Sequence, residues 1–452
     1  MKTSSLLPRF AAFALASLVA LVAFTLPAAA QQADFTTFVQ IGDSLTHGYT
    51  DGCVVEYAQR DSVGAIIARQ AGVTNFEQAL IKAPGLGPCM VLTSLAPTFG
   101  YRPNTGTPLN ATLSRPYNNL GISGFTISQA VDSNPATPAG GIAFTVLRGQ
   151  GTMLQQAAAL KPTFLTIWIG NNDSLNAVGL GTVIDGVTLT PKAVFDSKLQ
   201  TIVDTMKTAQ GGTGKGVILN MGDVAGIPFA TTVPAILGTN PATGAPIYAY
   251  YNGCAAGVPA ALCSVPAGSL LTLYAAQLLQ QGYGIPCQLL DAAGAPAADP
   301  RRANCLVFSA TTGAIVSGKQ LPDNCDLSGG PASCSARPGV VLTPTELTLL
   351  RGRVAEYNAS IASMGPAAGY KVFDIAAWQK DLLAHPKVFA GMTVSTAYLS
   401  GGFVGYDGIH PTSIGYALIA RDLIAFINAN YGNSIPDVDM SPFLTRGNTS
   451  PG

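Results

Sequence analysis

Short apolar runs that alternate with helical segments constrain the fold of this chain more than any other feature. The runs have the length of buried β-strands, end at glycine or polar residues, and cover residues 38–41, 162–169, 216–221 and 370–375. Residues 73–78 are more polar and are interpreted as a fifth strand. Helical spacing of apolar side chains lies between them, at residues 62–71, 191–210 and 345–364, and again after residue 411. Strands that alternate with helices predict a parallel sheet covered on both faces.

The composition fits a large globular protein. Of the 452 residues, 48% are hydrophobic and 11% are charged, and the formal net charge is +0. This balance argues against a disordered chain and gives no basic surface for nucleic acid. The 50 glycines and 31 prolines occur without a repeat period, which indicates long ordered loops.

The first 30 residues have the pattern of a signal peptide. Lys2 and Arg9 precede an uncharged apolar run, and three alanines at positions 28–30 supply a small-residue cleavage site. We therefore expect residues 1–30 to be removed, the mature chain to contain no membrane span, and the protein to be secreted or periplasmic. An uncleaved membrane anchor is the alternative, because the run is long for a signal peptide.

All eight cysteines follow this segment, and an even number in an exported chain indicates disulfides. Because short loops close most easily, the expected pairs follow chain order: Cys53–Cys89, Cys254–Cys263, Cys287–Cys305 and Cys325–Cys334. A zinc site is the rival interpretation, but no C-x-x-C pair or neighbouring histidine supports it. We expect neither a metal nor another cofactor.

Two segments interrupt the strand and helix pattern. Residues 82–116 are crowded with Pro, Gly, Asn and Thr and predict a long loop, which a Cys53–Cys89 bond would tie back beside residue 44. Residues 231–340 hold six cysteines and predict a disulfide-rich insertion, because strand and helix signals resume after it. Residues 31–432 would then form one domain, followed by a loosely ordered tail at 433–452.

Ser44 directly follows the first apolar run, in the stretch Gly42-Asp43-Ser44-Leu45. In open α/β sheets, ligands bind beyond the carboxyl ends of the strands, so this serine is placed for chemistry. The alternative is that Ser44 or Asp43 only caps the helix that follows.

Two further positions have a functional and a purely structural interpretation. Gly124 either exposes its N–H to a ligand or serves a turn that needs positive φ. Asn172 follows the run at 162–169, and its amide either points across the strand ends or closes an Asx turn.

A serine nucleophile needs a base, and the chain has three histidines. His385 lies in a surface-like loop. His47 follows Ser44 by less than one helical turn, so its side chain points along the helix or lines the pocket. His410 precedes Pro411, which favours an extended backbone, and Asp407 on the same turn can fix its tautomer.

Four short blocks occur in the order known from one enzyme family. They are Gly42-Asp43-Ser44-Leu45, Asn119-Leu120-Gly121-Ile122-Ser123-Gly124, Gly170-Asn171-Asn172-Asp173 and Asp407-Gly408-Ile409-His410-Pro411. Over residues 35–432 the chain resembles the GDSL lipases and esterases, the SGNH hydrolases. No stretch spells G-x-S-x-G, so the α/β-hydrolase elbow is not a competitor.

The resemblance implies a flavodoxin-like three-layer α/β/α fold with a mostly parallel five-stranded sheet. It implies Ser44 as nucleophile, His410 as base and Asp407 as the partner of that base. The N–H groups of Ser44 and Gly124 and the side-chain amide of Asn172 would bind the oxyanion, and we expect His47 to contact substrate.

The sequence therefore predicts an exported serine esterase or lipase. It would cleave carboxylic esters of small molecules, lipids or acylated glycans through an acyl-enzyme. Acyl transfer or polysaccharide deacetylation at the same site is the enzymatic alternative. A non-catalytic surface binding module that keeps the fold is the other alternative, and the presence of every site residue argues against it.

Overall fold

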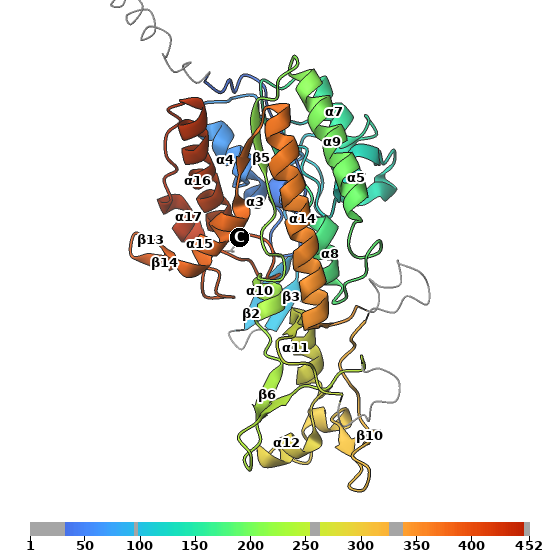
Figure 1. The fold of residues 1–452 in the computed structure, drawn as a ribbon. Helices are drawn as coiled ribbons and strands as arrows, with labels where there is room; N and C mark the ends of the chain where they lie inside the picture. Colours follow the sequence, from blue (N-terminus) through green and yellow to red (C-terminus); the bar gives the residue numbers. More distant parts are fainter. Residues whose placement is uncertain (1–31, 95–97, 254–262, 325–337, 447–452) are drawn as a thin grey trace, which may run out of the picture.

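The computed structural model describes residues 32–94, 98–253, 263–324 and 338–446 (Figure 1). The expected signal peptide at 1–30 lies outside the described residues, as do Cys254, Cys325 and Cys334. In the part of the chain that is described, no helix is both long and apolar enough to cross a membrane.

A parallel sheet of four strands forms the centre of the molecule. Its order is β1-β4-β5-β12, made of β1 (Phe38–Gly42), β4 (Phe164–Trp168), β5 (Gly216–Leu219) and β12 (Lys371–Phe373). Every neighbouring pair is parallel, with Phe38 opposite Phe164 and Leu165 opposite Gly216. Four of the five predicted strands are thus present, and each ends within two residues of its predicted boundary.

Residues 73–78 are not the fifth strand that the sequence predicts. Only Gln78 pairs, through an isolated bridge to Asn119, and Asn119 bridges in turn to Gln40 of β1. The segment before helix α5 takes this edge instead, because Gln40 N–H donates to Asn118 O over 2.8 Å and Leu120 N–H donates to Gln40 O over 3.0 Å. The described sheet therefore has four strands.

Alternate side chains of the strands enter two separate hydrophobic cores. In β4, Leu165 and Ile167 belong to one core, while Phe164 and Trp168 belong to the other. This alternation is what a strand buried on both faces requires. The first core is packed by α5 (Ile127–Asp132), α7 (Met153–Ala159), α9 (Lys192–Ala209) and α14 (Pro344–Ala368); the second by α4 (Val63–Gln70), α15 (Ile375–Ala384), α16 (Ser413–Tyr431) and α17 (Ser441–Arg446) (Figure 1).

The predicted helices are present with small shifts at their ends. Ser62 caps α4 by accepting a hydrogen bond from Ala65 N–H, and Thr343 opens α14 with a capping box. Helix α9 begins one residue later than predicted, with Pro191 rather than Thr190 at the N-cap. Further α-helices outside the insertion are α2 (Ser44–His47), α3 (Glu56–Arg60), α6 (Gly141–Leu147), α8 (Asn172–Gly179) and α10 (Pro228–Thr231).

The loop at 82–116 contains an antiparallel pair, β2 (Met90–Ser94) and β3 (Thr98–Tyr101). The disulfide Cys53–Cys89 ties this loop to the segment after α2, as predicted. A second short pair, β13 (Lys387–Phe389) with β14 (Met392–Val394), follows α15 and was not predicted.

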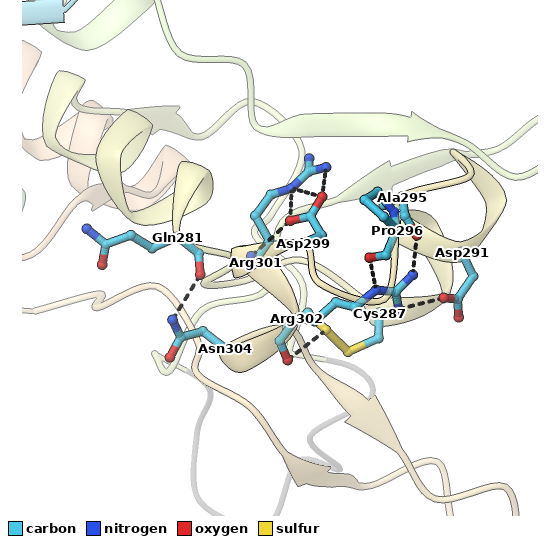
Figure 2. Close-up of a disulfide and its surroundings, with 10 residues drawn as sticks. Gln281, Cys287, Asp291, Ala295, Pro296, Asp299, Arg301, Arg302 and Asn304 are labelled. Carbon is cyan, nitrogen blue, oxygen red and sulfur yellow. Dashed lines mark hydrogen bonds and ion pairs between the residues drawn. A yellow bond between two sulfur atoms is a disulfide. The ribbon is translucent and has the colours of Figure 1, made fainter.

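The predicted insertion has a small core of its own, which includes Tyr251, Leu271 and Leu321. Helix α11 (Leu273–Gln280) agrees with the helical spacing at residues 270–281. The insertion contains more structure than its sequence suggests, namely β6 (Ile236–Thr239), β7 (Pro246–Tyr248), β8 (Leu270–Leu271), α12 (Cys287–Ala292), β9 (Val307–Phe308) and β10 (Ile315–Ser317). Strand β8 pairs with β11 (Val341–Leu342), which directly follows the insertion. Figure 2 shows the Cys287–Cys305 disulfide of the insertion, predicted correctly, beside the ion pairs of Arg301 and Arg302.

The tail is ordered as far as the structure describes it, so the prediction of a loose tail is wrong for residues 433–446. Ile435, Val438 and Phe443 are buried in the second core. Asn428 on α16 fixes the backbone of Ile435 with two hydrogen bonds, of 2.9 and 3.0 Å. These apolar side chains occur without helical or strand spacing, which explains why the sequence did not reveal their burial.

Candidate active site

Ser44 is the first residue of the short helix α2, directly beyond the end of β1. The turn before it requires glycine, because a Cβ on Gly42 would lie 1.9 Å from Thr46 Oγ1. Asp43 is the N-cap, and its carboxylate accepts the Leu45 N–H over 3.0 Å. Since Asp43 performs the capping, the Ser44 hydroxyl is left for another partner.

That partner is His410. Its Nε2 lies 2.9 Å from Ser44 Oγ, and its Nδ1 lies 2.8 Å from Asp407 Oδ2. Asp407 Oδ1 accepts the N–H groups of Ile409 and His410, which closes the turn before α16. The structure thus aligns hydroxyl, imidazole and carboxylate, the three groups that sequence analysis singled out.

The surroundings keep Asp407 ionised. Burial alone would raise the pKa of its carboxyl, but the neighbouring His410 and the hydrogen bonds it receives hold that pKa below its usual range. The Gly52 N–H adds a further hydrogen bond to Asp407 Oδ2 over 3.0 Å. A fixed carboxylate holds the imidazole so that Nε2 faces the serine.

Two residues that sequence analysis missed complete this cluster. The Tyr49 ring packs on the His410 ring with centroids 4.7 Å apart. Asp51 accepts the Tyr406 N–H over 2.6 Å, and burial together with the charge of Asp407 raises the pKa of Asp51 to about 7. Both contacts span more than 350 residues of sequence, so no local pattern indicated them.

The three candidate oxyanion donors lie on adjoining segments. Ile122 N–H bonds Gly42 O over 3.1 Å, which brings the segment with Gly124 beside the serine turn. Gly124 is exposed with φ +84°, and its N–H has no acceptor among the described residues. Asn172 Nδ2 donates one hydrogen to Phe125 O over 2.9 Å, and an amide nitrogen has a second hydrogen to give.

Asn171 makes a buried contact with the serine turn. Its Nδ2 donates to Asp43 Oδ2 over 2.8 Å. Burial raises the pKa of Asp43 to about 6, although this hydrogen bond works in the opposite direction. The next residue, Asp173, accepts the Ile127 N–H at the start of α5 and the Thr190 hydroxyl. Residues 170–173, which follow β4, therefore connect to the serine turn after β1 and to the start of α5, in addition to any role of Asn172.

His47, which we expected to contact substrate, is buried and is not among the residues that line the cavity next to Ser44. Its residue is only 3% exposed, and its Nδ1 lies 3.1 Å from Ser123 Oγ. A Cβ on Gly121 would lie 2.5 Å from His47 N, which shows how closely the Gly121–Gly124 segment covers it. Burial lowers the pKa of His47 to about 3, so the ring is neutral. His385, the third histidine, is exposed as expected and bonds Asp381.

A mostly apolar cavity of about 110 Å³ adjoins Ser44 and His410. Its walls come from the loop after β5, from α15 and from the segment before α16. The side chains and backbone that line it include Trp168, Asn171, Leu175, Val224, Ile227, Pro228, Ile375, Trp378, Gln379, Leu383, Phe403, Val404 and Ile409. Among the described residues, no group of three or more His, Cys, Asp or Glu side chains is arranged to hold a metal ion.

Comparison with known proteins gives distant likenesses only. No protein-family model matches the chain, and no curated protein matches it. Among solved structures, a lipase/acylhydrolase from Enterococcus faecalis is 13% identical, with a TM-score of 0.31. LAE5, an alpha/beta hydrolase from the metagenome of Lake Arreo, Spain, is 13% identical with a TM-score of 0.36. In both cases the alignment covers 89% of this chain and 98% of the other. Neither likeness is close enough to assign an activity, so the function is argued from the site.

Proposed function

We propose that this protein is a serine ester hydrolase of the GDSL type, with the three-layer α/β/α fold of the SGNH hydrolases. The observation that carries the proposal is the continuous hydrogen-bonded path from Ser44 Oγ through His410 to Asp407, with steps of 2.9 and 2.8 Å. The 2.9 Å step is within the range in which His410 takes the serine proton directly, and the 2.8 Å step is a hydrogen bond that orients the imidazole.

In the proposed reaction, Ser44 Oγ attacks the ester carbonyl while His410 Nε2 takes the hydroxyl proton. The carbonyl π electrons move to the oxygen, and the N–H groups of Ser44 and Gly124 and the Asn172 amide stabilise that oxyanion. When the tetrahedral intermediate collapses, the C–O bond to the alcohol breaks and His410 returns the proton to the leaving oxygen. Asp407 stabilises the imidazolium in between.

Water then completes the cycle. His410 takes a proton from a water molecule, whose oxygen attacks the acyl-Ser44 carbonyl. The second intermediate releases the carboxylic acid, and the proton on His410 goes to Ser44 Oγ. The neutral His47 has no part in these steps.

Export to an oxidising compartment belongs to the same proposal. The signal-like segment at 1–30 supports it, as do the disulfides Cys53–Cys89 and Cys287–Cys305, since such bonds persist outside the reducing cytosol.

The test is hydrolysis of p-nitrophenyl acetate and longer-chain esters by the purified protein and by Ser44→Ala. Loss of the nucleophile should lower kcat by about 10⁴–10⁶ while the circular dichroism spectrum stays the same. A fluorophosphonate probe should label Ser44 in the parent protein, as located by peptide mass spectrometry. Undiminished turnover by Ser44→Ala would exclude the proposal, and adding an alcohol acceptor separates hydrolysis from acyl transfer.

A further inference from the structure

The cavity that Ser44 and His410 line lies between two elements that the proposed chemistry does not use. One wall is the loop after β5, which contributes Val224 and Ile227. Another wall is helix α15, which contributes Trp378 among others. The nucleophile is therefore at a boundary between a polar cluster and an apolar space.

Most polar side chains in these walls are committed to other partners; Trp168 Nε1 is an exception, since it is buried without a partner among the described residues. Trp378 Nε1 donates to Asp422 over 2.7 Å, so the indole presents its apolar surface. Gln379 Oε1 accepts the Asp223 N–H over 2.8 Å, and Asp223 pairs with Arg351 at 3.1 Å. A ligand inside the cavity thus meets mainly hydrocarbon, which favours an alkyl group over a sugar or a charged group.

The size of the cavity sets the length of that alkyl group. A water-sized group needs about 10–15 Å³ of such space, so about 110 Å³ has room for roughly seven to eleven such groups. Leu383 is 48% exposed, whereas Trp168 and Val404 are buried. The cavity therefore opens to solvent at the Leu383 side, where the end of a longer chain can leave it.

We propose that this cavity binds the acyl chain of the substrate and selects straight acyl groups of about eight to ten carbons. The inference rests on the proposed function, because it is attack by Ser44 that places the acyl carbonyl at the cavity. It assigns Val224, Trp378 and Leu383 as specificity-determining residues.

A series of p-nitrophenyl esters from acetyl to palmitoyl tests this assignment. Each buried methylene is worth up to about fourfold in kcat/KM, so kcat/KM should rise from acetyl to about octanoyl or decanoyl and then level off. A flat series, or one that is highest for acetyl, would overturn the proposal.

Variants then locate the site. Val224→Phe fills the cavity and should move the plateau to shorter chains. Leu383 is half-exposed, so Leu383→Ala should fold normally. This variant should lower the ratio of kcat/KM for the decanoyl ester to kcat/KM for the acetyl ester severalfold. Val316→Phe on β10 is the matched control, because Val316 is 66% exposed and does not line the cavity. An unchanged plateau and ratio in both cavity variants would place the acyl chain elsewhere.

Calorimetry with Ser44→Ala separates the two levels of inference, since this variant should bind esters without cleaving them. Tighter binding of p-nitrophenyl octanoate than of the acetate supports the cavity even if the parent protein cleaves no ester, and equal binding contradicts it. If the parent protein cleaved esters of all chain lengths at equal rates, the proposed hydrolase function would hold and the proposed acyl-chain site would be wrong.

Discussion

The turn that carries His410 and the helix that carries His47 each place a histidine against a serine, yet only one pair is equipped for chemistry. His410 has a partner on both ring nitrogens, Ser44 and the carboxylate of Asp407, and borders a cavity. His47 lies 3.1 Å from Ser123 Oγ, but its Nε2 is buried without a partner among the described residues.

The difference teaches that contact between imidazole and hydroxyl is not sufficient for a base. When a base takes a proton it becomes a cation, and a buried cation without a carboxylate costs several kcal/mol. Asp407 offsets that cost for His410, and nothing comparable does so for His47. Four predictions test this distinction and the site around His410, in order of decreasing expected effect on kcat.

His410→Ala should be the most damaging change, lowering kcat by about 10⁴–10⁶, as loss of the serine does. Its counterpart His47→Ala should keep most of the activity, because no proton passes through His47. Steady-state kinetics on p-nitrophenyl octanoate measure both. If His47→Ala proved the more damaging of the two, the roles assigned to the histidines would be reversed.

Asp407→Asn should lower kcat by about 10⁴, because an amide neither stabilises the imidazolium nor fixes the same tautomer. Asp51→Asn is the informative neighbour, since it removes the carboxylate behind Asp407 but not the one that contacts His410. We expect Asp51→Asn to be far less damaging. Equal losses of kcat in both variants would mean that His410 depends on the combined charge of Asp51 and Asp407, and not on its hydrogen bond to Asp407 alone.

Asn172→Ala should lower kcat by about 10²–10³ with little change in KM, because its amide would act only on the developing oxyanion. Asn171→Ala cannot serve as the control, given its bond to Asp43. Asn176, exposed one turn further along α8, is the matched position. A Tm lowered by Asn172→Ala with kcat untouched would reduce Asn172 to a structural link to Phe125.

His47→Gln should have the smallest effect on rate and a clear effect on stability towards acid. The pKa of His47 in the folded protein is lowered to about 3, so its imidazole stays neutral as the pH falls. In the unfolded chain the same imidazole takes up a proton near its ordinary pKa. Stability contributed by His47 is therefore complete above about pH 6.5 and is lost as pH falls towards 3. The loss amounts to at most about 1.4 kcal/mol per pH unit.

Urea unfolding at pH 7, 6, 5 and 4 measures this slope for the parent protein and for His47→Gln. As the pH falls, the free energy of unfolding should decline less steeply in the variant than in the parent protein. The two slopes should differ by at most the contribution of one bound proton, about 1.4 kcal/mol per pH unit. Identical slopes would show that His47 is protonated in the folded state, and the contrast between the two histidines would disappear.

The sequence predicted the four strands of the sheet and the turn that joins Asp407 to His410, because each depends on a local pattern. The run at residues 162–169 consists mainly of apolar and β-branched residues and forms β4, and Asp407 and His410 are close enough in sequence to share a turn. The cavity wall was not predicted. Residues 375–384 have helical spacing and Asp374 as N-cap, but this helix follows β12 without a loop, so its start overlaps the strand predicted at residues 370–375.

Other features had no local signal to find. The contact of Asn171 with Asp43 spans 128 residues, and the packing of Tyr49 on His410 depends on the whole fold. The missing fifth strand follows from a competition between residues 73–78 and the segment at 118–120 for the free edge of β1. Such competition is decided by tertiary packing, which overrides strand propensity.

The hydrogen bond between Ser44 and His410 joins residues 366 positions apart. Ribosomes add about 5–20 residues per second, so roughly 20–70 seconds separate the synthesis of these two groups. Over that interval a nascent chain carries the serine hydroxyl without its proton acceptor. The proposed enzyme is therefore inert during most of its own translation, and products released before α16 is made cannot cleave esters in the cell that produces them.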